Sequence, residues 1–375
     1  MTSAELGTAT EMGRLIRPVL QHAAAYVPAA IVASNAHPAR EIKLDMNESP
    51  YGPSPKVAEA LATFHLTNRY PSFQQDRLRE AIGAYVGIPS RQVVPGSGMD
   101  DVLTNLYTTF VDPDDEVVIA EPTFGVYRHA IGIRGGVIVD VPLGPRPEFA
   151  FDVDGILAAV TGKTKLIMVC NPNNPTGHLI PSADIKRLVR AVPCPVVIDE
   201  AYAEFSGQTQ LGLMARYDNV CVLRTMSKWA GLAGMRVGYG IFPEWMLGAI
   251  WSVVPAFCNI STAAESAAIA ALADVDYLSG IVARLNGDRD ALAERLRTID
   301  GVRPFESATN FLLLSLPVAD AGPVREELAR RGIHVRYFGN PAHGLLDCLR
   351  VSIGTAEDNT LFADELERIL QEQRA

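Results

Sequence analysis

The chain has 375 residues, of which 48% are hydrophobic and 20% charged, and its formal net charge at pH 7 is −10. This length exceeds the roughly 250–300 residues at which a single hydrophobic core stops growing, so we expect two packed regions. The acidic balance argues against a nucleic-acid surface, which would need clustered Lys and Arg. The longest apolar stretch, around 249–273, is interrupted by polar residues and does not qualify as a membrane span. We therefore expect neither nucleic acid nor a membrane as a partner.

The five cysteines are widely spaced, with no C-x-x-C and no Cys/His cluster. This usage favours reduced thiols in a core rather than a disulfide framework or a metal site. The N-terminal region carries Arg14 and Arg17 but no continuous apolar segment, so it does not read as a signal peptide. These observations predict a reducing, cytoplasmic location.

The first part of the chain combines an arm with helical patterns. Residues 1–44 are rich in Ala and Pro and are expected to lie against another part of the protein or against a partner subunit. Apolar spacing predicts helices over 55–66, 74–86 and 102–110. Val93 to Gly98 predicts a strand that feeds a Gly-rich turn before the third of these helices. Free backbone N–H groups at such a helix start form an anion site, although many turns of this kind carry Gly for conformational reasons only.

Short apolar runs and helical patterns then alternate, which predicts a mostly parallel sheet covered by helices, an α/β fold. The runs are Val117–Ala120, Val137–Val141, Leu166–Cys170, Val196–Ile198, Val220–Leu223 and Val237–Ile241. In open α/β sheets, ligand-binding groups gather at the carboxyl ends of the strands. Polar segments follow three of the runs, at 171–177, 199–202 and 225–228. We therefore expect one shared site at this edge of the sheet.

The last part of the chain changes character. A charged helix is predicted over 284–298, and shorter strands and helices follow it to the end of the chain. The expected strands are 311–316, 333–337 and 349–354, with helices around 324–328 and from residue 357. We expect a large domain over 45–282, and a smaller α+β domain made of 283–375 with the arm 1–44.

Four chemical groups near the strand ends need a common explanation. Lys228 follows a buried apolar run, and desolvation of such an amine makes it an imine-forming nucleophile, whereas a lone Ser-Lys pair is more often a surface turn. Asp199 ends another strand, Tyr202 adds a phenol three residues later, and Arg236 adds a cation. Pyridoxal phosphate carries an aldehyde, a ring nitrogen, a phenolic oxygen and a phosphate, and so would use each of these groups.

At these residues the sequence resembles the fold-type I pyridoxal-phosphate aminotransferases, and more closely the histidinol-phosphate aminotransferase subfamily. The resemblance is carried by Tyr26, 43–55, 69–71, 171–177, 199–205, 224–239 and 349–355. It implies a large domain with a mostly parallel central sheet and a smaller α+β domain. It also implies amino transfer from L-histidinol phosphate to 2-oxoglutarate, a reaction of histidine biosynthesis.

The resemblance assigns roles around the cofactor. Lys228 would hold the cofactor covalently and later move a proton, and Asp199 would keep the ring nitrogen protonated. Tyr202 and Asn174 would hydrogen-bond the phenolic oxygen, and Phe124 would stack on the ring. The groups expected to hold the phosphate are Thr225, Ser227, Arg236 and the backbone N–H groups of Met99 and Asp100. Tyr70 would reach the same phosphate in the other subunit, which implies an obligate homodimer.

The resemblance also assigns substrate contacts. Arg350, in the stretch Leu-Arg-x-Ser-Ile-Gly, holds the place of the Arg that binds the substrate anion, which Arg does bidentately. Tyr26 and Arg336 match positions that help to bind the phosphate of histidinol phosphate. A second cation beside Arg350 favours a dianionic phosphate. Phe124 replaces the usual Tyr and so lacks a hydroxyl near the ring. Trp229 follows the Lys where a small residue is usual, and the segment 255–259 is a loose match, so we expect these two departures to affect specificity.

Other functions stay open at this stage. The same motifs suit an aromatic or broad-specificity amino-acid aminotransferase, or a phospho-amino-acid decarboxylase of the same fold. A non-catalytic regulator would call for a missing Lys or an added DNA-binding module. A nicotinamide dehydrogenase is disfavoured because no G-x-G-x-x-G opens the first βα unit. Asn171 and Asn173 are expected to form turns, and Glu48 and Glu200 to be structural.

Overall fold

The computed structural model describes residues 15–21, 41–255 and 259–374. Its larger sheet has seven strands in the order β2-β8-β7-β6-β5-β3-β4. Their bounds are β2 Val93–Ser97, β3 Glu116–Glu121, β4 Val137–Pro142, β5 Thr164–Cys170, β6 Val196–Asp199, β7 Val220–Thr225 and β8 Val237–Ile241. Each of the six predicted apolar runs forms one strand. Only β8 is antiparallel to its neighbours β2 and β7, so the prediction of a mostly parallel sheet is confirmed.

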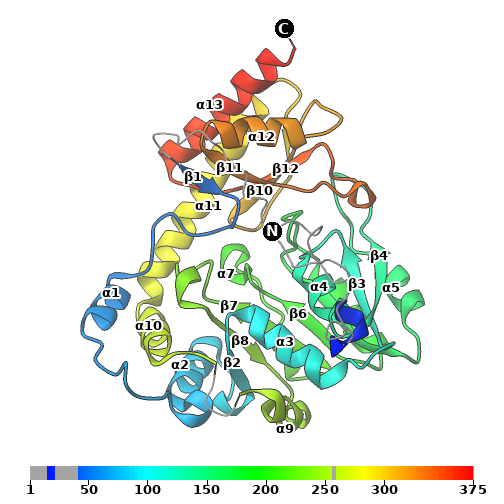
Figure 1. Ribbon diagram of the computed structural model, residues 1–375, viewed down its shortest axis with the longest axis vertical. Coiled ribbons are helices and arrows are strands. Elements are labelled where there is room, and N and C mark those ends of the chain that lie inside the picture. Colours follow the sequence, from blue (N-terminus) through cyan, green and yellow to red (C-terminus); the bar gives the residue numbers. More distant parts are fainter. Residues whose placement is uncertain (1–14, 22–40, 256–258, 375) are drawn as a thin grey trace.

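Helices cover this sheet (Figure 1). They are α1 Pro55–Ala62, α2 Asp76–Val86, α3 Met99–Phe110, α4 Val126–Gly132, α5 Val153–Ala159, α6 Ser182–Ala191, α7 Ala203–Ser206, α8 Leu211–Met214, α9 Glu244–Val253 and α10 Thr262–Leu272. Amphipathic spacing explains their packing: α6, for example, buries Ile185, Leu188 and Val189 on one face. The 3₁₀ turns are η2 Pro18–Leu20, η3 Phe73–Gln75, η4 Ser90–Gln92, η5 Ala233–Met235 and η6 Pro341–His343.

A second sheet of five strands has the order β1-β11-β12-β10-β9. Its strands are β1 Ile42–Leu44, β9 Arg303–Pro304, β10 Phe311–Ser315, β11 Ile333–Tyr337 and β12 Cys348–Ser352, and its helices are α11 Val275–Arg297, α12 Gly322–Arg330 and α13 Ala356–Glu372. β1 pairs in parallel with β11, so a strand from near the start of the chain joins elements from its end. In Figure 1 this sheet, α12 and α13 occupy the upper part of the molecule.

The long helix α11 begins at Val275, nine residues before the predicted start at Arg284. Its first turns bury Leu278 and Val282 in the same core as Leu285, which continues the apolar face backwards along the helix. The expected domain boundary at 282/283 therefore falls inside one unbroken helix, which runs between the two sheets (Figure 1).

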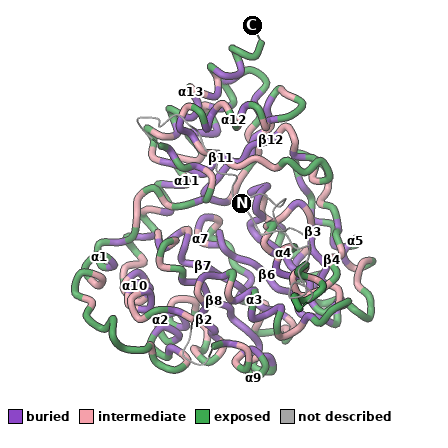
Figure 2. The backbone as a smooth tube through the Cα atoms, in the orientation of Figure 1, coloured by how far each residue is buried: buried purple, intermediate pink, exposed green. Residues whose placement is uncertain are grey.

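The centre of the larger sheet is buried on both faces, as a parallel sheet under helices must be. Every residue of β6 and β7 is buried. Figure 2 shows this burial at β6, β7 and β8, with exposed residues concentrated on the outer loops and helices. Such a rigid core holds the carboxyl ends of the strands in fixed positions.

Two further expectations can be compared with the described residues. Cys170, Cys194, Cys221 and Cys348 are buried free thiols, and Cys258 lies outside the described residues. Among the residues that the structure describes, no single helix is long and apolar enough to cross a bilayer. The pair α10 and α11 passes that test only when joined, with a bend of 80° between them.

Candidate active site

Adjacent strands of the larger sheet bring the predicted polar segments to one edge. β5 leads into the segment 171–177, β6 ends in Asp199, and β7 leads into the segment 225–228. These three strands are parallel neighbours, so their carboxyl ends lie side by side. The expectation of a common location is confirmed for these segments.

The turn between β2 and α3 forms one wall of an anion cradle, which we define as Gly98–Asp100, Thr225, Ser227 and Arg236. Gly98 is the N-cap of α3 and has a φ of 79°, a conformation that favours glycine. A Cβ at Gly98 would lie 2.5 Å from Nη2 of Arg236, so a larger residue would push the guanidinium away. The backbone N–H groups that open α3 have no partner one turn earlier in the helix, and they carry the positive end of its dipole.

Side chains at the end of β7, in the loop after it and just before β8 form the other wall of the anion cradle. The Thr225 hydroxyl donates to Ser227 Oγ at 3.0 Å. Arg236 Nη2 donates to Asp100 Oδ2 at 3.2 Å, and both of these side chains are about half exposed. Two hydroxyls, a guanidinium and free N–H groups suit a phosphate, which would replace Asp100 as the partner of Arg236.

Asp199 is buried at the end of β6 with both oxygens engaged. Its Oδ2 accepts a hydrogen bond from the Tyr127 hydroxyl, and its Oδ1 accepts one from the Ala201 N–H at 3.0 Å. Burial raises the pKa of Asp199 to about 6, and the two hydrogen bonds oppose that rise. A carboxylate held in this way can face a protonated ring nitrogen without reorienting.

Tyr127 was not identified from the sequence. It is fully buried in α4, and its ring meets the Phe124 ring edge-on at a centroid distance of 5.5 Å. Its position three residues after Phe124, one helical turn away, could have pointed to it. Phe124 itself is partly buried in the loop just before α4.

Lys228 lies in the loop after β7 and is partly buried. Its Nζ donates to the Met46 carbonyl at 2.7 Å. Burial, and secondarily the nearby Arg350, lower the pKa of Lys228 to about 8. At pH 7 about one tenth of the amines would therefore be neutral and able to attack a carbonyl.

Arg350 reaches the site from β12 of the second sheet. Its Nη1 donates to Asn174 Oδ1 at 2.6 Å, and its Nη2 donates to the Asp45 carbonyl at 2.5 Å. Arg336 is directly opposite Arg350 in the β11–β12 register, which places both side chains on one face of the sheet. The structure thus brings Asn174 and Arg350 together, and puts a second cation beside them.

Tyr202 is buried just after β6. Its hydroxyl oxygen accepts a hydrogen bond from Asn47 Nδ2 at 2.9 Å, and its ring meets the Phe311 ring edge-on at 5.2 Å. Burial raises the pKa of Tyr202 well above its ordinary value, so the phenol stays protonated. Asn47 lies in the segment 43–55 that the resemblance marks, but sequence reasoning gave it no role.

Three other residues singled out from the sequence do not join these side chains: two lie apart from them, and one lies outside the described residues. Tyr70 is 81% exposed in the loop between α1 and η3. Tyr26 lies outside the described residues. Trp229 is only 2% exposed and stacks on Tyr85 with ring centroids 5.2 Å apart. It therefore packs in the core beside Lys228 and offers almost no surface to a substrate.

The residues expected to be structural include three whose contacts bear this out. Asn171 Oδ1 accepts from the Ile180 N–H at 2.8 Å, and the Asn173 amide donates to the Pro122 carbonyl at 3.0 Å. Glu200 is buried and paired with Arg224 at 2.8 Å. These contacts fix the loops around the site from inside the protein.

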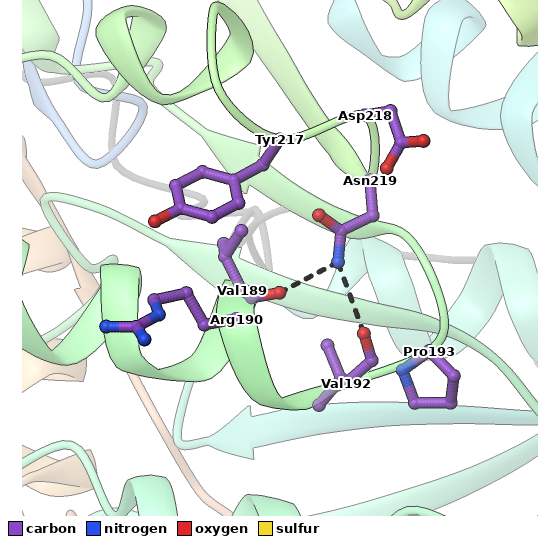
Figure 3. A pocket seen from close by; sticks show the side chains of 7 residues that line it. All are labelled: Val189, Arg190, Val192, Pro193, Tyr217, Asp218 and Asn219. Atoms are coloured by element: carbon purple, nitrogen blue, oxygen red, sulfur yellow. Dashed lines mark hydrogen bonds between the residues drawn. The ribbon is translucent and has the colours of Figure 1, made fainter.

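A hollow of about 370 Å³ lies at the opposite edge of the sheet, near the start of β7 (Figure 3). Asn219 lines the hollow, and its amide donates to the carbonyls of Val189 and Val192. Arg190, Tyr217 and Asp218 line its sides. Because it lies at the amino ends of β6 and β7, it is separate from the site described above.

The groups at the carboxyl edge fit pyridoxal phosphate, the cofactor that the sequence resemblance implies. The anion cradle suits the phosphate, and Asp199 suits a protonated ring nitrogen. Tyr202 has a hydroxyl proton with no acceptor assigned among the described residues, which suits the phenolic oxygen. The lowered pKa of Lys228 suits bond formation with an aldehyde.

Comparisons with known proteins agree with this reading. Residues 39–366 match the family described as Aminotransferase class I and II. The chain is 39% identical over 339 residues to the histidinol-phosphate aminotransferase of Roseiflexus castenholzii, covering 88% of this chain and 90% of that protein. It is 39% identical over 352 residues to the enzyme of the same name from Methanococcoides burtonii, covering 92% and 96%.

A solved structure gives the same result. The histidinol-phosphate aminotransferase of Sinorhizobium meliloti, determined in complex with pyridoxal-5'-phosphate, has a TM-score of 0.86 and 26% identity, covering 95% of this chain and 97% of that one. The predicted fold is therefore confirmed as that of the pyridoxal-phosphate aminotransferases. The chain belongs to the class I and II aminotransferases and, within them, to the histidinol-phosphate aminotransferase family.

Proposed function

We propose that this protein transfers the amino group of L-histidinol phosphate to 2-oxoglutarate with pyridoxal phosphate as cofactor, a step of histidine biosynthesis. The observation that carries the choice of substrate is the pair of cations on one face of the second sheet, Arg336 directly opposite Arg350. A carboxylate needs one such partner, whereas a dianionic phosphate uses two. Two relatives that are 39% identical over most of the chain are named histidinol-phosphate aminotransferase.

Bound pyridoxal phosphate would supply an aldehyde carbon that captures amines and a ring that accepts electrons. The protein's own groups would do the rest. Lys228 would hold the cofactor and afterwards carry a proton on Nζ, which its lowered pKa of about 8 permits near neutral pH. Asp199 would keep a proton on the ring nitrogen, while Tyr202 and Asn174 would orient the phenolic oxygen.

Substrate and phosphate contacts complete the proposal. Arg350 and Arg336, with Tyr26, would bind the phosphate of the amino donor, and Arg350 would bind the carboxylate of the 2-oxo acid. Phe124 would stack on the cofactor ring, and the anion cradle would hold its phosphate.

We also propose a cytoplasmic homodimer. Tyr70 is 81% exposed in the single chain, although it is a large aromatic residue. In a dimer it would reach the phosphate bound by the other subunit. The division into a large domain over 45–282 and a small domain of 283–375 with 1–44 belongs to this proposal, with α11 as the shared helix.

A visible titration of the cofactor-loaded protein with histidinol phosphate would test the function. We expect the band of the Lys-linked cofactor to convert to that of its aminated form, and 2-oxoglutarate to restore the original band. Histidinol, which lacks the phosphate, should require a concentration at least about 100-fold higher, because a doubly paired phosphate contributes several kcal/mol. Arg336→Gln should weaken the binding of histidinol phosphate but leave the binding of histidinol almost unchanged.

The control for this titration is Arg190→Gln, which removes a cation at the hollow on the opposite edge of the sheet. It should bind both amines as the parent does. A protein that ignores histidinol phosphate but converts fully with phenylalanine would be an aromatic or broad aminotransferase instead. Release of carbon dioxide without need of an oxo acid would identify a decarboxylase.

Removing the hydroxyl of Tyr127 tests how Asp199 is tuned. The bond from Tyr127 stabilises the charged carboxylate, so Tyr127→Phe should raise the pKa of Asp199 above its present value of about 6. A hydrogen bond to a charged group contributes about 1.5–3 kcal/mol, so the acid limb of the pH–rate profile should move up by about one to two pH units. The measurement is kcat/KM from pH 5 to pH 9.

Tyr107→Phe is the matched control for Tyr127→Phe. Tyr107 lies in α3, is as fully buried as Tyr127, and its hydroxyl has no hydrogen-bond partner among the described residues. This variant should keep the parent pH profile. Equal shifts in the two variants would mean that burial, and not the bond to Asp199, sets the profile.

A further inference from the structure

Three consecutive residues between β1 and α1 each contact a different residue of the site. The Asp45 carbonyl accepts from Arg350 and the Met46 carbonyl accepts from Lys228. The Asn47 side chain then donates to Tyr202. In Figure 1 this chain leaves β1 in the upper sheet and descends to α1 beside the larger sheet. We call residues 45–47 the connector.

Asn47 is the most firmly held residue of the connector. It is 2% exposed and has a φ of 54°, a backbone conformation that few residues other than Gly adopt. Its N–H donates to Ser352 Oγ at 2.8 Å, and the Ser352 hydroxyl donates to Asn47 Oδ1 at 2.9 Å. The Asn310 amide donates to the Asn47 carbonyl at 3.0 Å. Both of these partners belong to the second sheet or to the turn that precedes β10.

These contacts fix the direction of the Asn47 amide. Because Oδ1 accepts from Ser352, Nδ2 is the atom that faces Tyr202, and it can only donate. The phenol oxygen of Tyr202 is therefore occupied as an acceptor, and its own proton is directed elsewhere. A hydroxyl that accepts one hydrogen bond is also the stronger donor in the next, as in other hydrogen-bond chains.

We propose that Asn47 is a positioning residue that orients the Tyr202 hydroxyl toward the phenolic oxygen of the cofactor, and so links the second sheet to the electronic state of the cofactor. The proposal rests on the proposed function only in requiring bound pyridoxal phosphate. Loss of the Asn47 amide is therefore expected to weaken the hydrogen bond that the Tyr202 hydroxyl donates to the phenolic oxygen, and so to favour the protonated form of the bound cofactor.

The experiment is a spectroscopic pH titration of the cofactor-loaded full chain. Asn47→Gly removes the amide and tolerates the positive φ, so it spares the backbone. We expect the titration midpoint of the visible band to rise by about 0.5 to 1 pH unit, a three- to tenfold change in the proton equilibrium. In the Tyr202→Phe background, the same substitution should move the midpoint by less than about 0.2 unit, because residues that act through one contact are not additive.

Ser49→Ala is the control, since the Ser49 hydroxyl lies just beyond the connector and has no hydrogen-bond partner among the described residues. It should leave the midpoint unchanged. An unchanged midpoint in Asn47→Gly, or an equal shift with and without the Tyr202 hydroxyl, would overturn the proposal. Failure of histidinol phosphate as a substrate would leave this titration measurable, so the two proposals can fail separately.

Discussion

Replacing Lys228 with Ala is expected to lower the rate of amino transfer by at least about 10⁴-fold. The variant lacks the Nζ atom, which serves both as the covalent attachment of the cofactor and as the proton carrier. Lys228 lies in the loop that follows β7, and burial lowers the pKa of its amine to about 8. The anion cradle remains in the variant, so we expect pyridoxal phosphate still to bind, without a covalent link. Borohydride reduction followed by mass spectrometry measures that link, which should be on Lys228 in the parent and absent from the variant.

Lys165→Ala is the control for this prediction. Lys165 lies in β5, and its exposed amine is paired with Asp115 at 3.5 Å, away from the carboxyl edge. This variant should keep both the covalent link and the rate. Added methylamine should restore part of the rate to Lys228→Ala by supplying the missing amine. A Lys228→Ala protein that still carried reducible cofactor on another lysine would refute the central assignment.

Replacing Asp199 with Asn is expected to reduce kcat about 10³-fold or more, because a neutral amide cannot keep the ring nitrogen protonated. The same change should stabilise the cofactor-free protein at pH 7. The pKa of Asp199 is raised from 3.8 to about 6 by burial, so the folded chain binds more protons than the unfolded chain between these values. Stability from this group is therefore full below about pH 4 and is lost as the pH rises to about 6.

The expected size follows from the shift of about two pKa units, which corresponds to about 3 kcal/mol at pH 7. The measurement is the free energy of unfolding of cofactor-free parent and Asp199→Asn, by denaturant titration at pH 4.5 and at pH 7. The difference in favour of Asn should be larger at pH 7. An equal difference at the two pH values would show that burial does not disfavour the charged form of Asp199. It would contradict the raised pKa on which this prediction depends.

The sheet and the position of the site were predictable because they depend on local patterns. Runs such as 196–198 and 220–223 are apolar on both faces, which is typical of strands in a parallel sheet covered by helices on both sides. Asp199 follows the first run directly and Lys228 comes five residues after the second, so the edge they share could be deduced from the parallel topology. The family resemblance then supplied their expected roles.

Contacts made across long sequence separations were not predictable in this way. Tyr127 reaches Asp199 over 72 residues, and Asn47 reaches Tyr202 over 155. Nothing in the local sequence of either residue indicates which polar group it will meet after folding. Trp229 illustrates the same limit: the sequence marks it as a departure from the family pattern beside Lys228, but only the structure shows that its ring packs on Tyr85 in the core.

The two sheets are joined through α11 and through the chain between β1 and α1 (Figure 1). They also contact each other directly: the Ala308 N–H donates to the Gly177 carbonyl at 2.8 Å, and Arg350 donates to Asn174. At the rim, Arg146 meets Asp347 at 2.9 Å in a partly exposed pair, the kind that contributes at most about 1 kcal/mol. Because Arg336 and Arg350 lie opposite each other on neighbouring strands, any shift of the second sheet against the larger one would change the distance of both cations from the carboxyl edge at the same time.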